Sequence, residues 1–470
     1  MTTTRLLLIA VLAGASPAAG QSVRVASAAR ADTALVVATT RADTALAADS
    51  AAAKPLAKPM RIALPPVEIQ HLRPAGQRGL NVYESPKDEG VPFTGFKVNW
   101  GGAFTQQFQN LTHQNTAAPK VVLGVDQNSL IPIGSGFNNA NANLVLNVQL
   151  ARGIRVALES YLSARHHQES WVKDGYFLID ASPIDNSLLD KIMEYATLKV
   201  GHFEINYGDA HFRRSDNGNT LYNPFVGNYI IDDFTTEIGA EAYLRSDGLI
   251  AMVGMTGGEV HGQVTAPGKR GPSYLAKLGL DEQLTDKLRM RLTGSMYKTD
   301  RSVSNTLSSG SRAGSRYYDV LENTTSTETA NAWSGDIQSK MSNMVTAFVV
   351  NPFVKYGGAE FFGNVETMTG AGAAELQRRT LHQYVGEGLY RFASDQLYVG
   401  GRYNLVTGEL PGIANNVTVR RTQIGGGWYV TPNVLSKIEF VNQRYLDFPV
   451  NDIRSGGQFK GFMIEGAVGF

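Results

Sequence analysis

The sequence contains no cysteine, which excludes disulfides, thiolate metal sites and cysteine nucleophiles together. Beyond the N-terminus it lacks any apolar run of about eighteen residues, which excludes a helical membrane protein with several spans. The chain also lacks an excess of charge of one sign, because 43 Lys and Arg are balanced by 42 Asp and Glu. A net charge of +1 without a long basic stripe gives no reason to expect a nucleic-acid partner.

Catalytic motifs are missing as well. No Gly-x-Ser-x-Gly occurs, and we expect no catalytic residue, no cofactor and no metal site. His166-His167 beside Glu169 resembles a metal-binding group, but a hairpin tip favours solvated histidines. The glycine runs at 370–372 and 425–427 do not open a helix after a buried strand, so they indicate a flexible loop and close packing rather than phosphate cradles.

What is present is a supply of turn-forming and aromatic residues: 49 Gly, 19 Tyr and 20 Phe. Hydrophobic residues make up 43% of the chain and the mean hydropathy is −0.16, which is neither oily nor typical of disorder. A membrane protein with this composition has to be a closed barrel, because only a closed sheet satisfies its backbone groups in lipid without helices.

The first residues have the pattern of a secretory signal peptide. Arg5 precedes an apolar core from Leu6 to Leu12, and Ala18-Ala19-Gly20 form a small-residue cleavage site. The alternative is a short membrane anchor, but the apolar core is too short to span about 30 Å of hydrocarbon as a helix. The sequence therefore predicts a signal peptide over residues 1–20 and export.

Two further segments precede the strands. Residues 21–60 are rich in alanine and contain RADTAL twice, a composition that predicts a flexible, disordered periplasmic tether. Residues 61–94 are rich in proline, which predicts an extended periplasmic segment leading into the first strand. A small plug is the alternative for residues 61–94.

From residue 95 to 470, segments of about ten residues alternate in polarity and are separated by turns. Ten residues of tilted strand cover roughly 23 Å, close to the apolar band of an outer-membrane barrel. We therefore predict an all-β fold, a transmembrane antiparallel β-barrel of about sixteen strands. A soluble β-sandwich shows the same alternation and is the alternative at this point.

The connections alternate between short and long, as expected for a barrel with periplasmic turns and external loops. The short ones are predicted at Arg152-Gly153, Ser246-Asp247, Asn351-Pro352, Ala393-Ser394 and Thr431-Pro432. The long ones are 110–142, 205–235, 259–271, 299–342 and 445–456. One exception is 181–194, where Ser187 to Met193 are predicted to form a helical turn.

Alternation also assigns the faces of the strands. Arg or Lys at mid-bilayer costs about 2 to 4 kcal/mol, so charged residues opposite apolar ones are placed in the lumen. The predicted pore-lining and anion-binding residues on strands are Arg155, Lys199, Arg289, Arg291, Arg402 and Arg421. Glu159, Glu241, Glu387 and Glu439 are placed beside them, together with Arg391 and Lys437, so the lumen is predicted to be mixed in charge.

The last strand separates the barrel from the sandwich. Phe462, Ile464, Val468 and Phe470 fall on one face, and the sequence stops on the aromatic. This resembles the C-terminal signal of bacterial outer-membrane proteins, which the barrel assembly machinery reads. We expect that machinery, outer-membrane lipid and lipopolysaccharide as partners, and the bacterial outer membrane as the location.

The stretch from Asn143 to Asp209 resembles the phosphate-selective porins and related general porins. The similarity lies in a strand–turn–strand over 143–165, in Lys173-Asp174-Gly175-Tyr176, and in Leu198 to Phe203, which is similar to the family's K-V-G-x-F strand. The family's Pro-Phe-Gly-like turn is replaced by 204–208.

The resemblance implies that the loop over 206–233 narrows the lumen, with Arg213 and Arg214 favouring anions such as phosphate. Alternatively, both arginines lie in solvent or contact lipopolysaccharide. The resemblance also allows a homotrimer. The predicted function is passive diffusion of small hydrophilic solutes, and the alternative is a barrel enzyme or a plugged scaffold or adhesin that acts through its external loops.

Overall fold

The computed structural model describes residues 67–84, 87, 91–163, 170–214, 219–258, 264–309, 318–327 and 335–470. Outside this part of the chain lie the predicted signal peptide and tether, residues 61–66, 85–86 and 88–90 of the segment that follows them, and His166-His167 with Glu169. Among the described helices, none is long and apolar enough to cross a membrane.

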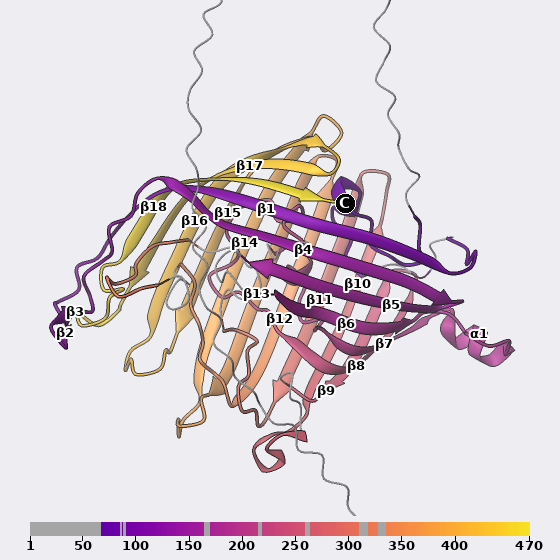
Figure 1. Ribbon diagram of the computed structural model, residues 1–470, viewed down its shortest axis with the longest axis horizontal. Coiled ribbons are helices and arrows are strands. Elements are labelled where there is room, and N and C mark those ends of the chain that lie inside the picture. Colours follow the sequence, from indigo (N-terminus) through magenta and orange to yellow (C-terminus); the bar gives the residue numbers. More distant parts are fainter. Residues whose placement is uncertain are drawn as a thin grey trace, which may run out of the picture. The chain divides into compact units, whose positions relative to one another are not determined.

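Sixteen strands of the described chain form one closed antiparallel barrel, which confirms the predicted fold. Each strand pairs with its neighbours in sequence, and β1 closes the barrel against β18, as the indigo and yellow ends show in Figure 1. The strands are β1 (Lys97–Gln114), β4 (Gly136–Ala151), β5 (Ile154–Ser163), β6 (Ser170–Ile179), β7 (Ala196–Glu204), β8 (Thr236–Ser246), β9 (Leu249–Thr256), β10 (Ser273–Gln283), β11 (Leu288–Thr299), β12 (Met344–Tyr356), β13 (Ala359–Ala371), β14 (Arg379–Phe392), β15 (Leu397–Gly408), β16 (Val417–Thr431), β17 (Val434–Leu446) and β18 (Gln458–Gly469).

Smaller elements lie in the connections. A two-stranded hairpin of β2 (Val121–Val122) and β3 (Val125–Asp126) lies in the first long loop. The predicted helical turn is confirmed as α1 (Ser187–Met193), because the Asn186 side chain accepts hydrogen bonds from the amides of Leu188 and Leu189. Single 3-10 turns occur at Gly76–Gly79, Ala210–Phe212 and Pro267–Lys269.

The two faces of the wall follow the predicted alternation. Leu292 and Ile424 point outward and keep 56% and 62% of their surface exposed, whereas Gln383 and Glu439 point into the lumen and are fully buried. A residue period of two on a closed sheet produces this division, because successive side chains point to opposite faces. The outside of the barrel is therefore apolar, whereas its inward face carries polar side chains together with a cluster of buried apolar ones that includes Leu381, Val419 and Met463.

One turn prediction is wrong. β12 continues through Asn351 and Pro352, and the turn follows at Gly357, whose φ of +56° is the left-handed conformation that glycine tolerates. Proline donates no hydrogen bond to the ladder, so this pair has no register partner in β13. The Asn351 side chain compensates by donating to the Gly363 carbonyl at 3.1 Å and the Asn364 amide oxygen at 2.8 Å.

The C-terminal strand closes the barrel as far as the last residue. β18 ends at Gly469, yet the amide and carbonyl of Phe470 exchange hydrogen bonds of 3.0 Å with Gly102 of the first strand. Phe462, Ile464, Val468 and Phe470 all lie on the outward face, where Ile464 and Phe470 are exposed.

Candidate functional site

The long connection between β7 and β8, which the structure describes over residues 205–214 and 219–235, folds into the barrel and is held there by the far wall. Carboxylate and amide side chains on β14, β15 and β17 accept hydrogen bonds from its backbone. Glu439 accepts from Val226 at 2.8 Å, Asn404 from Ile230 at 2.6 Å, and Gln383 from Ile231 at 2.8 Å. We call residues 205–235 the inner loop, since its backbone amides find their partners inside the lumen.

The start of the inner loop is fixed by a buried charge network. The Asp209 carboxylate lies 2.7 Å from the Lys277 ammonium and 2.8 Å from the Arg291 guanidinium, and it accepts a hydrogen bond of 2.8 Å from Thr293. Burial alone would raise the pKa of Asp209, but the two cations outweigh burial and hold the pKa below its ordinary value. Asp209 is therefore a charged anchor.

A second carboxylate joins this network from the N-terminal segment. Glu84 lies 2.8 Å from the ammonium of Lys277 and 2.6 Å from the guanidinium of Arg291. Burial would raise the pKa of Glu84, yet Arg291 and Lys277 hold it well below the ordinary range. The same two wall cations thus bind both the inner loop and the N-terminal segment.

Arg213 and Arg214, the two arginines of the inner loop that the sequence predicts to bind anions, are buried and paired with carboxylates. The Arg213 guanidinium lies 2.5 Å from Glu387 on β14 and donates at 2.8 Å to the Asn81 side chain. Arg214 is paired with Asp232 within the same loop. Glu387 also accepts from Arg402 on β15 at 2.7 Å, so one wall carboxylate binds two predicted anion-binding residues. Both arginines lie inside the barrel, where Arg213 attaches the inner loop to the wall and Arg214 forms an ion pair within the loop.

The other nominated residues divide into two groups. Arg421 donates to the backbone carbonyl oxygens of Asn228 and Gly335, and Arg289 pairs with Asp281 at 2.7 Å, so both hold chain segments together. Arg289 also borders open space, and so do the remaining two, Arg155 and Lys199. Arg155 donates to Asn147 at 3.2 Å, and Lys199 lies 3.7 Å from Glu241 and 4.2 Å from the centroid of the Phe203 ring.

The segment 67–84 also lies in the barrel, at the end that carries the short turns. The Gln77 amide donates at 2.6 Å to the carbonyl of Pro432 in the β16–β17 turn. Arg289 donates at 3.0 Å to the Asn81 carbonyl, and the Asn81 side chain donates at 2.7 Å to Glu360. We call residues 67–84 the mouth segment; its contacts run to strands, turns and the inner loop alike.

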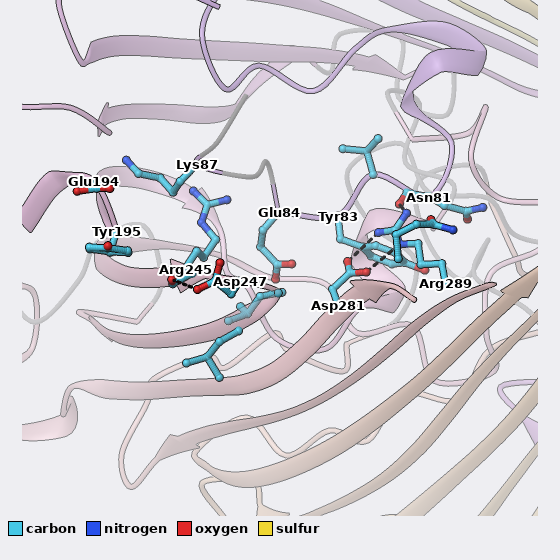
Figure 2. A pocket seen from close by; sticks show the side chains of 16 residues that line it. Asn81, Tyr83, Glu84, Lys87, Glu194, Tyr195, Arg245, Asp247, Asp281 and Arg289 are labelled. Atoms are coloured by element: carbon cyan, nitrogen blue, oxygen red, sulfur yellow. Dashed lines mark hydrogen bonds and ion pairs between the residues drawn. The ribbon is translucent and has the colours of Figure 1, made fainter. Parts of the chain in front are cut away.

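Open space is concentrated on one side of the lumen. One cavity of about 660 Å³ opens at the short-turn end between the mouth segment and β8 to β11, and Figure 2 shows Glu84, Arg245, Asp281 and Arg289 around it. A second cavity of about 310 Å³ lies between the mouth segment, the inner loop and the wall of β4 to β8. Tyr83, Glu84 and Arg245 line both cavities, so the two adjoin.

The opposite side of the lumen is filled. The long connection after β11 packs onto the inner loop, with the Ile337 amide donating to the Ile230 carbonyl at 2.7 Å. Tyr318 from the same connection donates at 2.6 Å to Glu439, the acceptor of the inner-loop backbone. The open space of the described barrel therefore lies along the wall from β4 to β11.

Sequence reasoning missed Lys277, Asp209 and Glu84, which are central to the arrangement. Lys277 showed no distinguishing signal among inward residues, whereas Asp209 lies within the stretch that resembles the porins and so fell near a nominated site. Among the described residues, no group of three or more histidine and carboxylate side chains has a geometry suited to a metal ion.

Comparison with known proteins gives structural neighbours only. No family model matches the chain, and no curated protein matches its sequence. The anion-selective porin from Comamonas acidovorans superposes with a TM-score of 0.50 at 9% identity, covering 80% of this chain and 100% of that one. OprB of Pseudomonas putida (TM-score 0.48, 10% identity, 80% and 94% covered) and the outer-membrane channel DcaP of Acinetobacter baumannii (0.46, 10%, 81% and 99%) are also similar. At this identity the likeness shows that the chain has the barrel fold of outer-membrane porins.

Proposed function

We propose that the protein is an outer-membrane channel through which small hydrophilic solutes diffuse passively along a narrow path. The observation that carries this function is a closed barrel with an apolar outer face and two adjoining cavities lined by charged and polar side chains. Sixteen strands make a barrel wide enough to leave an aqueous channel, and the inner loop narrows it. No chemical step is required.

The proposed location rests on the outer surface and on the sequence. The outward apolar belt suits a bilayer, and the alternation of short and long connections suits short turns in the periplasm. The predicted signal peptide would export the chain, and the outward alternation ending at Phe470 would be read by the barrel assembly machinery. Association as a homotrimer is part of the same proposal.

The proposed path favours small anions, including phosphate, only weakly. Arg213 and Arg214 do not support this preference, because carboxylates neutralise both. Support comes from the cavity along β4 to β8, where five basic side chains meet four acidic ones. They are Arg73, Arg155, Lys173, Lys199 and Arg245 against Glu84, Glu159, Asp174 and Glu204.

Conductance in planar bilayers tests the function directly. The purified folded barrel is expected to give single-channel steps well below those of a wide, unobstructed sixteen-strand pore, because the inner loop and the long connection after β11 occupy part of its lumen. A barrel that is folded, as shown by heat-dependent migration on gels, but never conducts would contradict the proposal. That outcome would favour a closed scaffold acting through its external loops, the function that the buried interior otherwise supports.

Neutralising the cavity bases is expected to reduce anion preference. The double substitution Arg155→Gln and Lys173→Gln removes two positive charges and leaves Glu159 and Glu204 on the path, so the anion-to-cation permeability ratio should fall by roughly twofold. Reversal potentials in a salt gradient measure it. Lys191→Gln on α1, an exposed site away from the cavities, is the control and should change nothing. An unaltered ratio in the double variant would place the path elsewhere.

A further inference from the structure

Three cations stand on the outer wall at the end of the barrel that carries the long loops. Arg420, Arg444 and Lys460 lie on the neighbouring strands β16, β17 and β18, which run side by side in Figure 1. All three are exposed and point outward, since the strands alternate and their sequence neighbours Val419, Arg421, Gln443, Tyr445 and Phe459 are buried on the inward face. None of the three side chains forms a hydrogen bond or an ion pair with any residue that the structure describes.

The strand register concentrates these charges. Arg420 is directly opposite Arg444 on the adjacent strand, and Lys460 is diagonal to Arg444, since it pairs with Asn442. Directly opposite side chains have Cβ atoms about 5 Å apart, and like charges in that position are destabilising. The arrangement therefore lacks its counter-charge within the described chain. The outward Lys298 on β11, by contrast, lies 3.5 Å from Asp300.

Polar groups complete the surface between the cations. Gln458 is opposite Arg444, and its side chain donates at 2.8 Å to Asn442, which is opposite Lys460. The amide pair thus spans one diagonal of a square whose other diagonal joins Arg444 and Lys460. We call Arg420, Arg444 and Lys460 with this amide pair the basic patch. Its amides leave hydrogen-bonding capacity beside the charges.

The basic patch borders the apolar belt. Two residues along β17 from Asn442 lies Phe440, and two residues along β18 from Lys460 lies Phe462; their rings are 6.2 Å apart. Phe108 on β1 continues this aromatic row, 6.4 Å from Phe462. Aromatic rows mark the edges of the lipid-exposed band in outer-membrane barrels. The cations therefore lie at the level of lipid headgroups and not at mid-bilayer.

We propose that the basic patch binds the phosphate of a lipid headgroup in the leaflet at the long-loop end, with the acyl chains lying along the aromatic row. The lipid is a phosphorylated glycolipid of the lipid A type, because a phosphate monoester brings the two negative charges and several acceptors that three cations and two amides match. The inference rests on the proposed membrane location. It assigns a site that is independent of the lumen.

Binding of lipid A to the detergent-solubilised full-length barrel, followed by native mass spectrometry, tests the site. The triple variant Arg420→Gln, Arg444→Gln, Lys460→Gln is expected to bind bis-phosphorylated lipid A on the order of a hundredfold more weakly, because each cation near a lipid surface contributes a few-fold. The control Lys120→Gln, Lys191→Gln, Lys287→Gln removes three exposed charges elsewhere and should bind as the original chain does. Equal binding by the patch variant would overturn the proposal. Displacement by inorganic phosphate at the concentration of lipid A would overturn the lipid assignment.

Reversing the charge of one side chain in the basic patch provides a second test that does not depend on the triple variant. Arg420→Glu places an acid opposite Arg444, so it should raise the midpoint of thermal unfolding in neutral detergent, where the like charges face each other unscreened. In vesicles containing lipid A the same variant should unfold at a lower temperature than the original chain, because it repels the phosphate. A shift of the unfolding midpoint in the same direction in detergent and in vesicles would contradict the site. A variant that still conducts would leave the channel function intact, so the two proposals fail separately.

Discussion

The substitution Asp209→Asn is expected to lower the free energy of unfolding by about 3 to 5 kcal/mol, because it leaves two buried cations without a full counter-charge. Asp209 is fully buried and contacts Lys277, Arg291 and Thr293 at 2.7 to 2.8 Å. Asparagine keeps the shape but cannot neutralise either cation. Glu84 then remains as the shared acid of both, and the start of the inner loop should detach from β10 and β11.

Urea unfolding of the barrel in detergent measures this loss, and limited proteolysis reports whether the inner loop has been released. Asp185→Asn is the matched control, because Asp185 is fully exposed and its contact with Arg152 is 3.8 Å long. Exposed ion pairs contribute little, so this control should unfold at the urea concentration of the original chain. Asp209→Asn unfolding at that same concentration, with the inner loop still protected, would show that the network does not hold the loop.

The dependence on pH follows from the same carboxylate. Because the pKa of Asp209 is lowered in the folded barrel, its carboxylate contributes its full stabilisation at pH values above the ordinary pKa of about 3.8. This contribution is lost as the pH falls below that value. Glu84 acts in the same direction, since its pKa is also held down by Arg291 and Lys277 against the effect of burial. The difference in stability between the original chain and Asp209→Asn should therefore shrink in acid. Unfolding measured at pH 7 and near pH 3 tests the trend.

Alternation and turn parity predicted the strands and their order, because both are local properties of a chain whose strands pair with their neighbours in sequence. The outward alternation of the last strand then separated the barrel from a sandwich. The turn that was wrongly predicted within β12 shows the limit of this reasoning. Asn351-Pro352 has the residues of a turn, and only the neighbouring ladder reveals that an asparagine side chain supports proline within β12. Turn propensity is a property of the isolated segment, whereas the position at which the strand ends depends on its pairing in the closed sheet.

The partners of the inward charges were beyond sequence reasoning. Arg213 and Glu387 are separated by 174 residues, and Arg291 and Glu84 by 207. Alternation placed Arg291 and Glu387 in the lumen, but nothing local indicates which loop carboxylate or guanidinium arrives there. In the structure Arg213 pairs with the wall carboxylate of Glu387 and Arg214 with Asp232 of the same loop, and anion binding by these two arginines stays a prediction. The prolines of residues 61–94 predicted extended chain and did not reveal that residues 67–84 contact the barrel interior.

Removal of the mouth segment is expected to raise single-channel conductance by about twofold or more, since this segment lines both cavities. A variant lacking residues 21–84 keeps all sixteen strands of the described barrel. Arg213 retains Glu387, and Lys277 and Arg291 retain Asp209, so the inner loop keeps its attachments to the wall. The barrel should therefore still fold while its short-turn end opens.

The loss of Glu84 is matched by a loss of positive charge in the same deletion. Lys277 and Arg291 each lose one of their acids, but Arg73 leaves the cavity lining together with Glu84, so the net charge along the cavities is unchanged and anion preference should stay close to its original value while conductance rises. The control lacks residues 21–60 only and retains the mouth segment; its conductance and reversal potential should match the original chain. Planar-bilayer recordings of the three proteins separate the contribution of the mouth segment from that of the residues before it. An increase in conductance in both deletions would assign the obstruction to the residues before the mouth segment. Unchanged recordings in the longer deletion would show that residues 67–84 do not restrict the path.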